Sequence, residues 1–472
     1  MIGGTCDTVG IAGCWLSGCY GAFSKKFGNG ALNMLAARVA LANGSIVTAS
    51  ECSHPDLFWS LRGGGGGVGG VVTEFVARTH PVPTHVTGMS VNIAATTSEE
   101  YHKAVMAGLE VFSKVTEEPD QAPNGGVGFN RSPIANTDPV QYHYDFSINL
   151  QGYNSDPVKQ AALLQPLVDY ANAQPVNGSV YGKATLSKAE VWKPEYYDPN
   201  VPWGSVGNAT VGNGTLPWAQ FSGEKSSSTG GGPNGVAGMM SKFVPQHYIK
   251  TKEGRSNLAS AMIKVTEQIG GASFMTPKGQ AGIPEEQQGW FNKTSLNPVI
   301  LDAGGTLFSY AFMPWLAQVP PSSTALRGIW GGGLNKSTVL GSNATRVKEI
   351  LALCDAGAAG DEDKAVACIH LWQFTLIPEH LKKVDIVRDI LDVALPNVDA
   401  AGKPFSGSYW SETDYHERDF QLAYWGAEKY QKLLAIKQAY DPDGLFICHH
   451  CVGSEFWTAE SKLMCRNESM IV

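Results

Sequence analysis

The segment Gly3–Gly21, GGTCDTVGIAGCWLSGCYG, places six glycines and three cysteines within nineteen residues. Glycines expose backbone N–H groups that can cradle a phosphate, and four are spaced to do so: Gly10, Gly13, Gly18 and Gly21. Three hydroxyl side chains add further donors, from Thr5, Thr8 and Ser17. The lysine of a Walker-type phosphate loop is missing, so the segment is not a P-loop. We therefore predict a ligand-binding surface here.

A second glycine run, GGGGGVGG at Gly63–Gly70, lies between the apolar stretch LFWSL and the β-branched stretch VVTEF. It satisfies the pattern G-x-G-x-x-G, but a dinucleotide fingerprint needs a strand before the glycines and a helix after them. The expected order here is the reverse, which excludes a Rossmann site. Glycines between two packed elements indicate a close backbone approach, either to a ligand, which we favour, or to neighbouring protein.

The elements around these glycines can be read from local signals. Asn43-Gly44 between ARVAL and SIVTA predicts a β-hairpin. SHPDLFWSL predicts a helix with Ser53 as its cap and Pro55 in its first turn, ending at Gly63. VVTEFVART then reads as a strand.

Beyond residue 84 the chain alternates between helical and extended patterns. Helices are expected at 98–116, 157–173, 257–269, 379–395 and 422–440. Strands are expected at 144–153, 307–313 and 368–378, and the Gly/Ser-rich stretch 202–233 reads as a surface excursion.

Composition narrows the class of protein. A chain of 472 residues with 43 % hydrophobic and 17 % charged residues is globular and long enough for two domains. The net charge is −8 and no run of Lys and Arg occurs, which argues against a nucleic-acid partner. No apolar stretch approaches the roughly 18 residues of a membrane span.

Nine Asn-x-Ser/Thr sequons point to passage through the secretory pathway: Asn43, Asn130, Asn177, Asn208, Asn213, Asn292, Asn335, Asn343 and Asn467. We therefore expect a secreted, extracellular glycoprotein. The first twenty residues lack the basic and apolar regions of a signal peptide, which suggests a missing beginning.

The nine cysteines leave at least one thiol without a partner within the chain. We expect disulfides between Cys354 and Cys368, and between Cys465 and either Cys448 or Cys451. The sequence CHHC at 448–451 could also ligate a metal, but a structural or disulfide role is favoured and no metal is expected.

Several of these stretches resemble one known family. CDTVGIAG, NGSIVTAS, HPDLFWSLRGGGGGVGGVVTEF and HPVP are similar to flavoproteins of the vanillyl-alcohol-oxidase superfamily, whose FAD domain is of the PCMH type. YWSETDY and YWGAEKYQKLLAIKQAYDPDGLF resemble the berberine-bridge-enzyme-like module that ends many of them.

The resemblance implies a domain plan. Residues 1–83 correspond to the second half of the FAD-binding domain, 84–404 to an α+β substrate domain with an antiparallel sheet flanked by helices, and 405–472 to a C-terminal segment returning to the FAD domain. Family members carry the first half of the FAD domain before these motifs, so an N-terminally truncated chain is expected.

The resemblance also implies an FAD site. Cys6 stands where the family often carries a thiol bonded to the flavin, although a buried thiol or half of a disulfide is the alternative. Asp7 replaces the usual proline, and Cys14 and Cys19 replace family glycines, departures that bear on covalent attachment. The implied cofactor contacts are Thr5, Cys6, Thr8, Val9, Gly10, Gly13, Ser17, Gly18, Tyr20, Gly21, Asn33, Gly69 and Val71.

Catalytic candidates come from the C-terminal block. The family pattern Y-x-N-Y-x-D is matched by Tyr409–Asp414, with Glu412 where the second tyrosine usually stands. Tyr409 and Glu412 are therefore predicted to be catalytic, with Glu412 as a base. The alternatives are a solvated turn for Glu412 and simple packing for Tyr409. His370 and Gln373 could line the pocket, but a core histidine is favoured.

We thus expect an FAD-dependent oxidoreductase that moves a hydride from an alcohol, sugar or secondary metabolite to the flavin, with oxygen as electron acceptor. A monomer whose partners are a small-molecule substrate and oxygen is expected. One alternative is a truncated, non-catalytic remnant without flavin. Another is a secreted glycan-binding protein, suggested by twelve tryptophans and the sequons.

Overall fold

A computed structural model describes residues 2–4, 9–21, 23–95, 97–115, 124–133, 142–173, 190–192, 210–211, 214–215, 236–269, 271–275, 303–312, 377–414, 416–460 and 463–466. The described residues form two compact units. Unit 1 combines those within Met1–Val82, Pro277–Gly304 and Leu395–Val472, and unit 2 those within Pro83–Thr276 and Gly305–Ala394.

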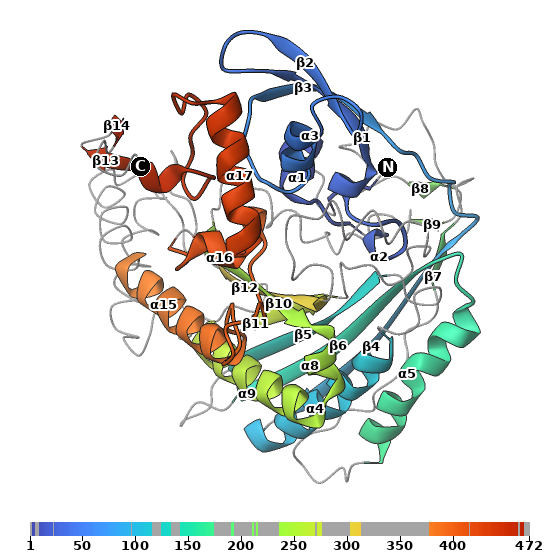
Figure 1. Ribbon diagram of the computed structural model, residues 1–472. Helices are drawn as coiled ribbons and strands as arrows, with labels where there is room; N and C mark the ends of the chain where they lie inside the picture. The colour runs from blue at the N-terminus through green and yellow to red at the C-terminus, as the bar shows by residue number, and fades with distance from the viewer. Residues whose placement is uncertain are drawn as a thin grey trace, which may run out of the picture. The chain divides into compact units, whose positions relative to one another are not determined.

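Unit 1 contains an antiparallel sheet of three strands in the order β2-β1-β3 (Figure 1). Its strands are β1 (Met34–Ala40), β2 (Ile46–Ser50) and β3 (Val71–Ala77). Ala40 pairs with Ile46 across the turn at Asn43-Gly44, which confirms the predicted hairpin. Apolar residues of these strands pack with α3 (Pro55–Leu61) in one core that includes Trp15, Met34, Val39, Leu57 and Phe58.

Short helices connect to this sheet. They are α1 (Ile11–Ser17), α2 (Ser24–Phe27) and the 3₁₀ turn η1 (Gly30–Asn33). The expected helix at SHPDLFWSL is α3, but Ser53 is not its cap. The residue that caps it is His54, in a left-handed conformation with a φ of 49°. The hydroxyl of Ser53 instead lies 3.1 Å from Nδ1 of His54.

The prediction of a single helix at 422–440 is wrong in one respect. It is two helices, α16 (Phe420–Trp425) and α17 (Ala427–Tyr440), separated by Gly426 with a φ of 74°. A residue at such a φ cannot continue a right-handed helix. The break lets Trp425 Nε1 donate to the carbonyl of Gly63, 2.9 Å away, so the C-terminal block contacts the glycine run. Short elements near this block are η7 (Trp410–Glu412), η8 (Ser454–Phe456), β13 (Trp457–Glu460) and β14 (Leu463–Arg466).

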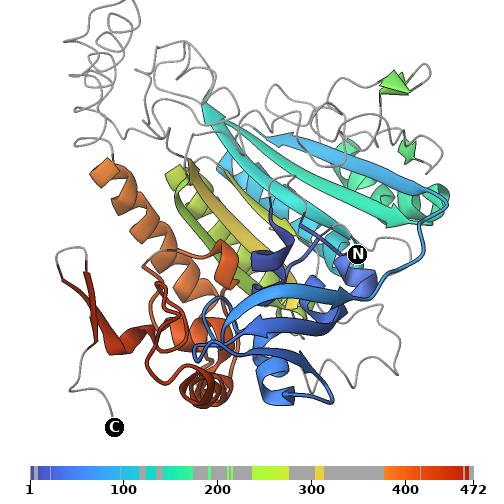
Figure 2. The ribbon, with the colours of Figure 1, turned by 90° about the horizontal axis from the view of Figure 1, so that it is seen from above.

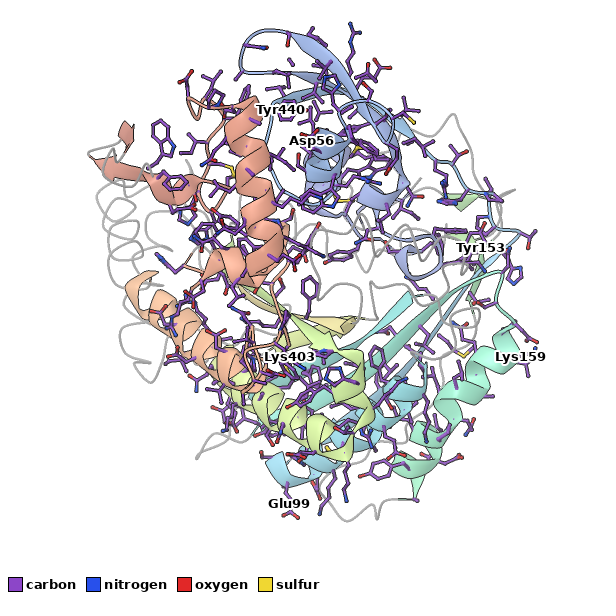
Figure 3. The ribbon with its side chains drawn as sticks, in the orientation of Figure 1. Asp56, Glu99, Tyr153, Lys159, Lys403 and Tyr440 are labelled. Atoms are coloured by element: carbon purple, nitrogen blue, oxygen red, sulfur yellow. A yellow bond between two sulfur atoms is a disulfide. The ribbon has the colours of Figure 1, made fainter. Side chains whose placement is uncertain are left out.

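Helix α17 also contacts α3. The phenol of Tyr440 donates to Oδ1 of Asp56 at 3.0 Å, and Figure 3 shows the two side chains together. Burial raises the pKa of Tyr440 to about 12, with the hydrogen bond to the Asp56 carboxylate acting in the same direction. This contact joins the first 82 residues to the C-terminal block within unit 1.

Unit 2 is built on a seven-stranded sheet in the order β10-β12-β11-β5-β6-β4-β7. The strands are β4 (Val86–Ala95), β5 (Asn124–Pro133), β6 (Tyr142–Tyr153), β7 (Glu190–Trp192), β10 (Val236–Pro245), β11 (Gly271–Met275) and β12 (Ala303–Phe312). Strands 144–153 and 307–313 were thus predicted within a few residues, whereas 368–378 lies outside the described residues. A separate two-stranded ribbon pairs β8 (Thr210–Val211) with β9 (Gly214–Thr215).

Helices cover one face of the sheet (Figure 1). They are α4 (Ser98–Val115), α5 (Pro157–Asn172), α8 (Gln246–Lys250), α9 (Lys252–Ile269) and α15 (Ile377–Ala394). Figure 2 shows α15 alongside the edge strand β10. Gly108 of α4 lies against Phe146 of β6 so closely that a Cβ there would come within 2.0 Å of the ring. This face therefore carries the core of unit 2. No helix among the described residues has the length and apolarity to span a membrane.

Candidate active site

Tyr409 reaches back to the first residues of the chain. Its side chain is buried, and the backbone N–H of Cys19 donates to its phenol oxygen at 3.1 Å. The hydroxyl of Ser17 lies 3.4 Å from the same oxygen. Burial raises the pKa of the Tyr409 phenol, while the hydrogen bonds from Ser17, Ser411 and Cys19 act in the opposite direction. The phenol oxygen is thus supplied with donors able to stabilise a negative charge.

Tyr20 and Glu412 form a second contact beside the first. The phenol of Tyr20 donates to Oε2 of Glu412. The rings of Tyr20 and Tyr409 are 5.4 Å apart between centroids. The hydroxyls of Ser17 and Ser411 also hydrogen-bond to each other. We call this group the tyrosine–glutamate cluster: Ser17, Cys19, Tyr20, Tyr409, Ser411 and Glu412.

The cluster joins two segments nearly four hundred residues apart. Of the predicted site residues it contains Ser17, Tyr20, Tyr409 and Glu412. Gly18 lies against it, because a Cβ there would be 3.4 Å from the ring of Tyr409. Cys19 and Ser411 are contributors that the sequence did not single out as site residues. Their only signal was position, next to Tyr20 and Glu412 respectively.

The start of helix α1 and the residues before it form an exposed, apolar surface next to the cluster. Val9 and Ile11 are exposed, and a Cβ placed on Gly10 or Gly13 would meet no atom within 4 Å. The predicted glycine loop is therefore in part a short helix, with Gly13 inside it. Gly21 differs from these glycines, because a Cβ there would lie 1.9 Å from the carbonyl oxygen of Gly3.

A disulfide joins Cys14 of α1 to Cys19, with their Cα atoms 4.6 Å apart. A second disulfide joins Cys448 to Cys451. The expected pairing of Cys465 with one of these two is therefore wrong, since both are already bonded within the CHHC sequence. The same bond removes the two thiolates that a metal site there would need, and the described residues contain no cluster suited to a metal ion. Cys52 is a free, exposed cysteine.

The side chain of Asn33 makes hydrogen bonds to neighbouring protein groups. Its side-chain nitrogen donates to the carbonyls of Phe27 and Asn29, and its Oδ1 lies 2.5 Å from Nε2 of His80. Asn29 next to it is buried, yet its Oδ1 has no hydrogen-bond partner. Its amide nitrogen would lie 3.9 Å from a Cβ on Gly18. Asn29 is therefore a buried acceptor near the cluster that the sequence did not reveal.

The second glycine run packs against protein. A Cβ on Gly69 would come within 2.5 Å of Leu57, and one on Gly65 within 3.0 Å of the Trp410 ring. Val71, at the start of β3, is exposed and pairs with Ala40. Gly65 and Gly69 therefore lie in tight contact with neighbouring protein side chains.

A buried ion pair holds the same run. The ammonium of Lys437 lies 2.5 Å from Oδ2 of Asp441 and donates to the carbonyl of Gly67 at 2.6 Å. It also donates to the carbonyl of Phe446. Burial opposes the charged form of Asp441, but hydrogen bonds from Lys437, Phe446 and Leu445 outweigh it and lower the pKa of Asp441.

Several predicted residues lie outside the described part of the chain. They are Thr5, Cys6 and Thr8 of the opening segment, His370 and Gln373 of the expected strand, and the expected pair Cys354 and Cys368.

Known proteins are similar to this chain over part or most of its length. The family model for berberine and berberine-like proteins matches residues 408–453, the block that carries Tyr409 and Glu412. The chain is 25 % identical to the FAD-linked oxidoreductase ZEB1 of Gibberella zeae, over 99 % of this chain and 62 % of that protein. It is 43 % identical over 100 residues to the xylooligosaccharide oxidase of Thermothelomyces thermophilus, which is 21 % of this chain and 20 % of that one.

The fold is also similar to that of solved flavoprotein structures. The crystal structure of the VAO-type flavoprotein MtVAO713 from Myceliophthora thermophila C1 superposes with a TM-score of 0.61 at 19 % identity, over 99 % of this chain and 65 % of that chain. The predicted α+β fold of a VAO-type flavoprotein is therefore confirmed. The chain spans about three fifths of the length of relatives such as ZEB1. The chain is thus similar to FAD-linked oxidoreductases over most of its length, carries a berberine-like block at residues 408–453 and shares the fold of VAO-type flavoproteins.

Proposed function

We propose that this protein is an FAD-linked oxidoreductase that oxidises a hydroxyl-bearing donor at the tyrosine–glutamate cluster. The observation that carries the proposal is the contact of Tyr20 with Glu412 beside the buried phenol of Tyr409. These are the residue types that move protons in enzymes. They lie next to an exposed, glycine-flanked surface on α1.

The described residues fit an FAD in two respects. Gly10 and Gly13 leave space that a side chain would fill, beside the exposed apolar side chains of Val9 and Ile11. The side-chain oxygen Oδ1 of Asn29 is buried and has no hydrogen-bond partner. It could therefore accept a hydrogen bond from an N–H or O–H group of the ligand. Val9, Gly10, Gly13 and Gly18 would hold the cofactor on this side, and Cys6 is the proposed point of covalent attachment.

When bound, FAD would accept a hydride from a C–H bond of the donor and pass the electrons on to oxygen. Glu412 takes the proton of the donor's hydroxyl group as a general base. Tyr20 fixes the position of the carboxylate through its hydrogen bond. Tyr409 lies beside this pair and shares the proton-handling role, with the N–H of Cys19 donating to its phenol oxygen and the Ser17 hydroxyl 3.4 Å from the same oxygen.

The donor class is supported by a relative. The chain is similar over 100 residues to a protein named as a xylooligosaccharide oxidase. We propose an alcohol or a sugar as the donor.

An oxidising, extracellular location is part of the proposal. Two disulfides among the described residues support it, because disulfides persist outside reducing compartments. Asn43 supports it too, since this sequon lies exposed at the tip of the β1–β2 hairpin.

The first test is the visible absorption spectrum of the purified protein, taken before and after acid precipitation. An oxidised flavin spectrum is expected, and colour that stays in the pellet would support a covalent bond at Cys6. Release of the colour into the supernatant would leave a non-covalent cofactor and remove the role of Cys6. A protein that stays colourless after addition of FAD contradicts the proposed function.

A further inference from the structure

The backbone at Cys19 adopts an unusual conformation. Its φ is 57°, in the left-handed region that disfavours residues with a Cβ. The residue is buried, and its neighbour Gly18 also has a positive φ, of 130°. The disulfide to Cys14 ties Cys19 to helix α1 across a sequence separation of five residues. A conformation that costs free energy is thus held by a covalent bond.

In this conformation the backbone N–H and the backbone carbonyl of Cys19 both make hydrogen bonds. Its N–H donates to the phenol oxygen of Tyr409 at 3.1 Å. Its carbonyl accepts from the N–H of Gly30 at 2.7 Å, and the carbonyl of Gly18 accepts from Ala31 at 2.9 Å. The loop is therefore anchored to η1 on one side and presents a backbone donor to Tyr409 on the other.

We propose that the Cys14–Cys19 disulfide is a positioning element for Tyr409. By holding Cys19 in the left-handed conformation, it keeps the Cys19 N–H directed at the phenol oxygen, where that N–H favours the phenolate form of Tyr409 over the protonated phenol. This inference rests on the proposed function, in which Tyr409 handles protons. The disulfide itself need not react, because its effect is to fix a donor in place.

The other described disulfide provides a matched comparison. Cys448–Cys451 lies in the same unit, and the Cys448 sulfur is 3.9 Å from the carbonyl of Gly66 rather than near Tyr409. Its removal changes the number of disulfides by the same amount without touching the donor on the phenol. Any effect specific to the Cys14–Cys19 bond can therefore be separated from a general loss of cross-links.

The experiment measures amide hydrogen exchange in peptides that contain residue 19, using the full chain without added cofactor. In the Cys14→Ala/Cys19→Ala variant, exchange of the residue 19 amide should rise at least about tenfold, the equivalent of one hydrogen bond. Cys14→Ala/Cys19→Gly should recover part of the protection, because glycine takes a positive φ freely. Cys448→Ala/Cys451→Ala should match the wild type.

A double-mutant cycle then tests the link to Tyr409. Tyr409→Phe removes the acceptor and should raise exchange at residue 19 in the wild type, but add little in the Cys14→Ala/Cys19→Ala background. The proposal would be overturned if Tyr409→Phe raised exchange at residue 19 equally in the wild type and in the Cys14→Ala/Cys19→Ala background. It would also be overturned if the protein without the disulfide exchanged at the wild-type rate. If the alanine variant does not fold, mild reduction of a protein that carries Cys448→Ala, Cys451→Ala, Cys354→Ala and Cys368→Ala supplies the same comparison.

The flavin-loaded protein offers a separate readout. Reduction of the Cys14–Cys19 disulfide should move the alkaline limb of the pH–rate profile upward by about one pH unit, as a lost donor to the phenolate predicts. An alkaline limb that stays in place under reduction would contradict the positioning role. A colourless protein would remove the proposed function, whereas the exchange result would still decide whether the disulfide positions the Cys19 donor.

Discussion

The phenol of Tyr20 donates a hydrogen bond to the carboxylate of Glu412, across a separation of 392 residues in the sequence. The contact joins the glycine-rich start of the chain to the block that matches the berberine-like family model. It gives a carboxylate a fixed orientation beside the buried Tyr409. The proposed chemistry depends on this pair.

Glu412→Gln should lower kcat by about a hundredfold to ten-thousandfold, because the amide cannot accept the proton of the donor. The measurement is steady-state oxidation with oxygen consumption as the readout. Glu428→Gln is the matched control, since Glu428 is an exposed carboxylate on α17. Activity of Glu412→Gln within a factor of two of the wild type would exclude Glu412 as the base.

Tyr20→Phe should lower kcat by about tenfold, because the carboxylate of Glu412 loses the hydrogen bond that fixes its orientation. The measurement is steady-state oxidation with oxygen consumption as the readout. Tyr430→Phe is a suitable control, because Tyr430 donates in the same way to Glu455 outside the cluster. An equal fall of kcat in both variants would show that the effect is not specific to Glu412.

Asp441→Asn should reduce the free energy of unfolding at neutral pH by about 3 kcal/mol, because it leaves the Lys437 ammonium buried without its counter-ion. The pKa of Asp441 is lowered in the folded protein, so its contribution is present above its ordinary value and is lost as the pH falls through the folded pKa. The difference from the wild type in urea unfolding should therefore narrow below about pH 4. Asp443→Asn, at an exposed position in the same loop, should have little effect at any pH.

Gly69→Ala should destabilise the protein by about 1–3 kcal/mol, because the new methyl group would overlap Leu57. The same change should cost less in a Leu57→Ala background, where space is available. Chemical denaturation of the four proteins in this cycle measures the coupling. Full additivity, combined with weaker flavin binding by Gly69→Ala, would favour the ligand role that we first predicted for this glycine.

Asn43→Gln should remove one glycan when the protein is made in a secreting eukaryotic host, because the sequon is exposed at a hairpin turn. Intact-mass analysis before and after glycosidase treatment gives the measurement. Identical masses for the treated and untreated wild type would contradict the proposed secretory route.

Local features of the structure were accessible from the sequence. The hairpin at Asn43-Gly44, the helix beginning at Pro55 and most helices of unit 2 follow from turn chemistry and periodicity within a few residues. The motif around Tyr409 and Glu412 also carried the family resemblance, because it is contiguous. Gly426 divided an otherwise periodic helix, and helical spacing alone does not show that a glycine has a positive φ.

The sequence by itself thus predicted the fold class, the family resemblance and four of the residues at the cluster, Ser17, Tyr20, Tyr409 and Glu412. Only the tertiary structure decided that Tyr20 meets Glu412, that Cys14 pairs with Cys19, and that Gly69 packs against Leu57. The reason is physical. Turns and helices depend on neighbours a few residues away, whereas these contacts depend on how distant segments pack, and the same residue types at the same spacing would permit other pairings.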